Sequence, residues 1–117
     1  MTNITHPELV AALAKPGDAI LKSLTAEKCH TLHMAIGISG EAGELLDAIK
    51  KHVFYEKEID RDNVVEELGD LAFYIEGLAT SLGITREEYL NQNIAKLTIR
   101  YGQKYSNQAA QHRADKN

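Results

Sequence analysis

Apolar residues recur along this chain at steps of three and four, the spacing that places side chains on one face of an α-helix. One stripe runs through a long helix that we expect from Thr25 to about Phe54, and another through a helix expected from about Asn63 to Leu82. No segment alternates apolar and polar residues as a β-strand would. The stripes consist of Ala35, Ile38, Ala42, Leu45, Leu46, Ile49 and Val53, and of Val64, Leu68, Leu71, Ile75, Leu78 and Leu82.

Polar residues and glycine mark the ends of these helices. Thr25 is suited to cap the first long helix, and Asp60 or Asp62 the second, because their side-chain oxygens can accept from free backbone N–H groups. Gly83 suits the left-handed residue that often ends a helix. Thr85 then begins an S/T-x-x-E capping box and a last helix. The sequence therefore predicts an all-α fold with three main helices.

Shorter elements are expected at both ends of the chain. Pro7 suits a first helical turn, so a short helix over residues 8–15 is expected, with a turn at residues 16–18 and a second short helix over 19–24. The last helix is expected to reach about Lys104. We expect a single domain over residues 1–105 and a polar tail, 106–117, that frays.

The first long helix has an unusual second face, with glycine at positions 37, 40 and 43. A glycine in a helix interior costs about 1 kcal/mol relative to alanine, so we expect close approach by another helix or a ligand there. A homodimer would supply such a helix and complete a four-helix core. This face consists of His30, His33, Gly37, Glu41, Glu44, Ala48 and Lys51.

Composition excludes several classes of function. The chain has 117 residues, 44% of them hydrophobic, and a net charge of −4, so it lacks the basic footprint of a nucleic-acid-binding protein. We expect no secretory signal, and no apolar run reaches the roughly 18–20 residues that a membrane span needs. The single cysteine, Cys29, cannot form an intrachain disulfide and is expected in the core. These features predict a cytoplasmic protein.

Two acidic pairs carry the chemistry. Glu41-x-x-Glu44 and Glu67-x-x-Asp70 each place two carboxylates on one helix face, and face-to-face packing of the two helices would bring all four together. Such a cluster repels itself unless a cation lies within it, and Mg²⁺ prefers oxygen ligands while keeping waters for a phosphate substrate. The neighbouring Glu66 falls on the far side of its helix and is expected in solvent.

Other polar residues leave alternatives open. His30 and His33 could ligate metal, but buried or interface histidines are the more common case. Glu27-x-x-His30 is half of a di-iron motif, which needs two such pairs. Lys96 and Arg100, which share a face of the last helix with Asn93, could be solvated charges or phosphate contacts. A non-catalytic helical dimer, such as a regulator, would use the same amphipathic helices.

Three segments, GEAGELLDAIKKH, EELGDLAFYIEGLA and NIAKLTIRY, closely resemble the MazG-like all-α nucleoside triphosphate pyrophosphohydrolases over about residues 32–105. The family signature is E-x-x-E followed, after a spacer, by E-x-x-D; here the spacer is residues 45–66. The resemblance implies Mg²⁺, with Mn²⁺ as a substitute, bound by Glu41, Glu44, Glu67 and Asp70.

The same resemblance implies hydrolysis of a (deoxy)nucleoside triphosphate to the monophosphate and pyrophosphate, as in cleansing of the nucleotide pool. It implies that Lys96 helps to hold the phosphates, with Arg100 and Asn93 as further candidates. Glu44 is our candidate for orienting the attacking water. Short members of the family resemble dimers or dimers of dimers, and the nucleobase is not readable from the sequence.

Overall fold

The computed structural model describes residues 3–102, which form helices joined by short connections and contain no strand. The all-α prediction is therefore confirmed for this part of the chain. The predicted end of the last helix at Lys104 and the polar tail lie outside the described residues. The helices are α1 (His6–Leu13), α2 (Gly17–Ser23), α3 (Ala26–Phe54), α4 (Arg61–Ser81) and α5 (Arg86–Tyr101).

The expected capping residues begin three of these helices. The side-chain oxygens of Thr25, Asp60 and Thr85 each accept a hydrogen bond from the backbone N–H three residues ahead, at 3.1 Å in every case. Gly83 has φ +69°, and Ile84 N donates to the Ala79 carbonyl at 2.8 Å, which closes α4 in a Schellman motif.

Several boundaries differ from expectation, and α1 spans His6–Leu13 rather than residues 8–15. α4 begins at Arg61 rather than Asn63, because Asp60 and not Asp62 is the cap. Gly17 and Asp18 belong to α2 rather than to a turn, because the extended backbone of Pro16 serves as the N-cap and Asp18 accepts from Ala19 N at 2.9 Å within the first helical turn.

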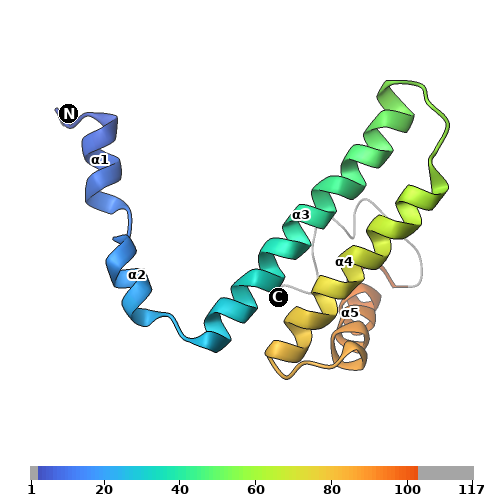
Figure 1. The fold of residues 1–117 in the computed structure, drawn as a ribbon. Helices are drawn as coiled ribbons and strands as arrows, with labels where there is room; N and C mark the ends of the chain where they lie inside the picture. The colour runs from blue at the N-terminus through green and yellow to red at the C-terminus, as the bar shows by residue number, and fades with distance from the viewer. Residues whose placement is uncertain (1–2, 103–117) are drawn as a thin grey trace.

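α3 and α4 form an antiparallel pair that is the main body of the molecule (Figure 1). Near one end, Thr31 Oγ1 donates to Ser81 Oγ at 3.3 Å. Further along, a Cβ atom at Gly37 would collide with the ring of Tyr74, so the glycine allows the helices to approach. The expectation of close approach is met at Gly37, whereas Gly40 has open space around it.

The apolar stripe of α4 takes part in this contact, with Val64, Leu71, Ile75 and Leu78 half-buried, whereas most of the α3 stripe does not. Within the chain, α3 contacts α4 through the face that carries Gly37, Glu41 and Ala48, which are buried or half-buried. Most of the expected α3 stripe is exposed, including Leu46 at 67% and Val53 at 57%. Small residues on α3 favour this contact because they allow the two backbones to come close. The aliphatic stripe of α3 remains available to another chain.

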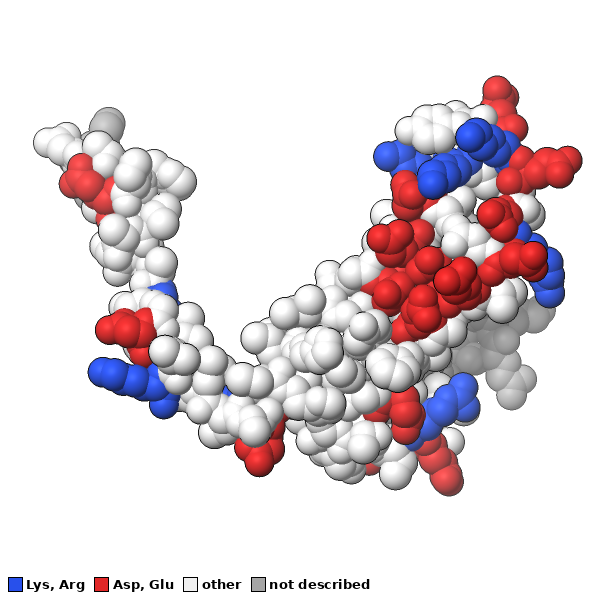
Figure 2. Space-filling view, in the orientation of Figure 1, with Lys and Arg blue, Asp and Glu red and all other residues white. Residues whose placement is uncertain are grey.

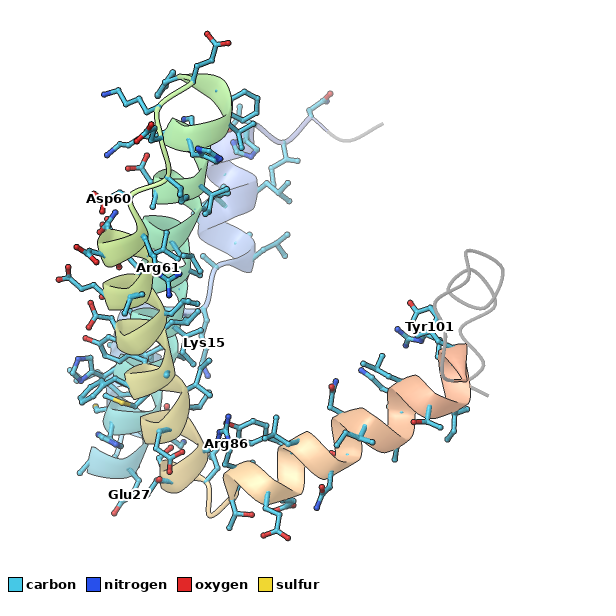
Figure 3. The ribbon with its side chains drawn as sticks, turned by 90° about the vertical axis from the view of Figure 1, so that its right-hand side faces the viewer. Lys15, Glu27, Asp60, Arg61, Arg86 and Tyr101 are labelled. Atoms are coloured by element: carbon cyan, nitrogen blue, oxygen red, sulfur yellow. The ribbon has the colours of Figure 1, made fainter. Side chains whose placement is uncertain are left out.

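The remaining helices stand apart from this pair. The α1–α2 segment, residues 3–24, is called the arm below; it extends from the start of α3 and leaves a V-shaped opening between itself and the α3–α4 pair (Figure 1). α5 leaves the end of α4 near Arg86 and points away from the pair, with Tyr101 at its far end (Figure 3). The radius of gyration is 20.3 Å, whereas a compact domain of this length has about 13 Å.

None of the helices in residues 3–102 combines the length and the apolar character that crossing a bilayer requires.

Candidate functional site

The carboxylates of the two acidic pairs meet where α3 and α4 face each other. Glu41 on α3 and Glu67 and Asp70 on α4 each place a carboxylate oxygen within 4.8 Å of the others. We call these three residues the carboxylate trio. Figure 2 shows acidic side chains gathered in one patch over the α3–α4 pair. Glu44 is exposed and is not one of the three, but it is near enough for its charge to act on Glu67.

Glu67 has the most perturbed environment in this group. Its Oε2 atom is buried and has no hydrogen-bond partner. The adjacent Glu41 carboxyl, loss of hydration and the negative charges of Glu41, Asp70 and Glu44 together raise the pKa of Glu67 from 4.5 to about 7. A raised pKa of this origin marks a place where negative charge is crowded and where a cation would be favourable.

No basic side chain in the described part of the chain neutralises these acids. The ion pair recorded among residues 3–102 joins Lys51 to Asp47 at 3.2 Å, one turn apart on α3. A buried carboxylate oxygen without a donor, next to two other carboxylates, fits a hard divalent cation, which takes oxygen ligands and removes the repulsion. The donor set is therefore suited to Mg²⁺ or Mn²⁺.

The contrast between Glu66 and Glu67 agrees with the sequence prediction. Glu66 is exposed, whereas Glu67 is half-buried in the face of α4 that contacts α3. Glu67, Leu71 and Tyr74 are all half-buried in this face, whereas Leu68 is 50% exposed.

The expected phosphate-binding residues do not join the carboxylates within one chain. Asn93 and Lys96 line a hollow of about 550 Å³ whose described lining residues all belong to α5. Arg100 lies further along the same helix, within 5.9 Å of the Tyr101 ring. Because α5 points away from the α3–α4 pair in Figure 3, the chain alone separates these residues from the trio.

The other candidate ligands take structural positions. His33 lies edge-on to the Tyr74 ring at 6.1 Å, and His30 lines a hollow with Glu27 and Ser81. Neither histidine belongs to a cluster of three metal-binding side chains in the described residues. Cys29 is exposed, so its expected place in the core was wrong for the single chain.

Tyr74 is a residue of the α3–α4 contact that the sequence pattern did not single out. Its ring fills the space over Gly37, packs edge-on against Phe73 with 5.2 Å between ring centroids, and lies two helical turns from Glu67 on the same face. The signal was present in the steps of four and three from Glu67 through Leu71 to Tyr74. The glutamate interrupts the apolar pattern of this face, so periodicity alone does not identify it as a packing face.

Comparison with known proteins identifies the family to which this chain is similar. A family model for the MazG nucleotide pyrophosphohydrolase domain matches residues 30–104. The Gene 37 protein of Mycobacterium phage L5 is 32% identical over 73 residues, which cover 58% of this chain and 63% of the phage protein. No solved structure matches the chain significantly. The matched region contains α4 and all four acids, and it excludes the arm.

Proposed function

The chain belongs to the MazG nucleotide pyrophosphohydrolase family, and we propose that it hydrolyses a nucleoside or deoxynucleoside triphosphate to the monophosphate and pyrophosphate in a Mg²⁺-dependent reaction. The observation that carries the proposal is the carboxylate trio, with the unpartnered buried Oε2 atom of Glu67 at its centre. A helical scaffold without catalytic function has no use for this costly cluster. Removal of unwanted nucleotides is the cellular role that such a reaction would serve.

Glu41, Glu67 and Asp70 would hold the metal, with Glu44 beside them. When bound, Mg²⁺ supplies positive charge to the phosphate oxygens and makes a coordinated water more acidic. Glu44 is the acid outside the trio and is exposed, so we propose that its carboxylate orients the attacking water or accepts its proton. The α3–α4 contact fixes the trio on rigid helices, so little reorganisation accompanies the reaction.

Asn93, Lys96 and Arg100 would contact the phosphates of the substrate. Since α5 leaves the α3–α4 pair of its own chain, we propose that a homodimer, or a dimer of dimers, brings α5 of one copy to the trio of another. The exposed aliphatic residues of α3 and α4 support such an assembly, because a monomer would leave Leu46, Val53 and Leu68 in water.

The experiment that tests the activity is pyrophosphate release from a panel of ribo- and deoxynucleoside triphosphates, with Mg²⁺, with Mn²⁺ and with EDTA. We expect release with either metal, none with EDTA, and a Mg²⁺-induced rise in melting temperature that reports binding separately. Absence of both release and the rise, across the panel, would favour the alternative of a non-catalytic dimerisation module.

A further inference from the structure

The arm carries a continuous apolar face with no partner in its own chain. Leu9, Val10 and Leu13 follow the spacing i, i+1, i+4 on α1, and the same spacing recurs in Ile20, Leu21 and Leu24 on and after α2. Leu13 is 75% exposed and Leu21 70% exposed, and neither helix of the arm contains a buried residue.

Helices this short do not persist in water without packing. α1 has 8 residues and α2 has 7, whereas isolated helices below about 12–15 residues are marginal even in favourable sequences. The side-chain cap at Thr5 and the backbone bond from Leu24 N to Leu21 O close their ends. Capping contributes too little to replace a packed face, so another surface must cover the leucines.

The joint between the arm and α3 directs the arm away from its own body. Only Leu24 and Thr25 separate α2 from α3. Lys28 spans the joint, because its Nζ donates to the Ser23 carbonyl at 3.0 Å and its backbone N–H donates to Thr25 Oγ1 at 3.1 Å. These two hydrogen bonds hold the joint in the conformation of Figure 1, in which the arm is directed away from the α3–α4 pair. Short joints of this kind favour exchange between copies.

Each copy of the chain also carries a surface that could receive the arm of another copy. The α3–α4 pair is mostly uncharged on the part nearest the arm (Figure 2). Between the two helices lies a hollow of about 510 Å³ whose lining includes Leu32, Ala35 and Leu82. The chain as a whole exposes 9757 Å², whereas a compact monomer of its mass exposes about 6,300 Å². The excess is larger than the roughly 1,000–2,500 Å² that each partner typically buries in an obligate dimer.

We propose that the arm is exchanged between two copies of the chain. The α3–α4 pair of the second copy enters the V-shaped opening of the first copy, and the apolar face of the first arm packs on it. The arm of the second copy packs on the α3–α4 pair of the first copy in the same way. Such an isologous exchange covers both exposed surfaces at once. It assigns a role to residues that precede the family match at residue 30. The inference concerns assembly, so it stands whether or not the proposed hydrolysis is observed.

The charges of the arm argue against a lipid membrane as the surface that covers its apolar face. Glu8 and Asp18 balance Lys15 and Lys22, so the arm lacks the basic polar face with which interfacial helices bind anionic membranes.

The test compares two double variants of the full chain by sedimentation velocity over a concentration series. Leu13→Glu/Leu21→Glu places two charges on the apolar face. Ala11→Glu/Ala19→Glu adds the same charge on the opposite side of the same helices, at residues that are also exposed. We expect the first to raise the dissociation constant of the assembly by at least about 30-fold. The control should stay within about threefold of the unaltered protein, since it loses no apolar contact.

Hydrogen exchange of the arm amides provides the second measurement, with circular dichroism to show that both variants remain helical. We expect residues 6–23 to be protected in the assembled protein and unprotected in Leu13→Glu/Leu21→Glu. Equal assembly of the two double variants would overturn the proposal. So would a monomer with a protected arm, which would mean packing within one chain, or protection that appears only when phosphatidylcholine–phosphatidylglycerol vesicles are added.

Discussion

The Glu67 carboxylate of α4 lies against the Glu41 carboxyl of α3, and the buried Oε2 atom of Glu67 has no hydrogen-bond partner. Two acids on a helix–helix contact oppose the packing that brings them together. The contact is held instead by its neighbours along the same faces, Gly37 with Tyr74 and Met34 with Gly77. The fold therefore maintains a locally unfavourable charge arrangement, which is the arrangement that a metal site requires.

Glu67→Gln should lower the rate of pyrophosphate release by at least about 100-fold, because it removes a charge from the centre of the trio while keeping the size of the side chain. Glu66→Gln is the matched control. Glu66 is exposed on the other side of α4 and should keep its rate within a few-fold. Steady-state kinetics of both variants on one accepted substrate decide the matter. An inactive Glu66→Gln, or a fully active Glu67→Gln, would show that the site lies elsewhere.

The metal-free protein should become less stable as pH rises through about 7. The folded protein raises the pKa of Glu67 from 4.5 to about 7, so between these values the folded state binds a proton that the unfolded state has released. The contribution of Glu67 to the free energy of unfolding is therefore fully present below pH 4.5, and it is lost as the pH rises through the folded pKa of about 7. Thermal melts in EDTA from pH 5 to pH 8 measure this contribution as the difference between wild type and Glu67→Gln.

In that comparison Glu67→Gln should gain melting temperature relative to wild type as pH rises, because the amide cannot ionise. Added Mg²⁺ should oppose the decline at pH 8 and have little effect at pH 5, where a protonated carboxyl is a poor ligand. A difference between wild type and variant that does not change with pH would contradict the assigned environment of Glu67.

Gly37→Ala should destabilise the fold by about 1–3 kcal/mol, because the added methyl group would occupy the space of the Tyr74 ring. Gly40→Ala is the control at the next turn of the same helix, where a Cβ meets nothing within 4 Å. Alanine there should stabilise α3 by up to about 1 kcal/mol. Urea unfolding of both variants measures the two free energies. Equal changes in the free energy of unfolding in the two variants would show that Gly37 is not required for the close approach of α3 and α4.

A hetero-oligomer of Glu67→Gln and Lys96→Ala chains should regain activity. If α5 of one copy completes the trio of another, each heterodimer contains one site with both defects and one intact site. The rate per heterodimer should then approach about half of wild type. Tandem purification of two differently tagged chains isolates this species, and each homo-oligomer serves as the inactive reference. Failure of the mixed species to exceed those references would place Lys96 beside the trio of its own chain, and an active Lys96→Ala homo-oligomer would place it outside the site.

The sequence by itself determined the helices and the two acidic pairs. Caps at Thr25, Asp60 and Thr85 act through hydrogen bonds within one turn, so they are readable from local sequence. Spacing along a helix likewise gave the two acidic pairs and separated Glu66 from Glu67, since helical geometry fixes the angle between neighbours. The family resemblance, which was inferred from segments that contain these acids, was confirmed by the match over residues 30–104.

Tertiary structure decided which faces pair. The sequence did not show how the apolar stripes divide: α3 and α4 meet through glycine, alanine, the acids and stripe residues such as Leu71, while Leu46 and Leu68 stay exposed. Periodicity identifies a face that avoids water but not the surface that covers it, and close backbone approach at Gly37 depends on a ring from a distant part of the chain. The directions of the arm and of α5 were also decided there, because two-residue and four-residue joints, not hydrophobic pattern, set the angles between helices.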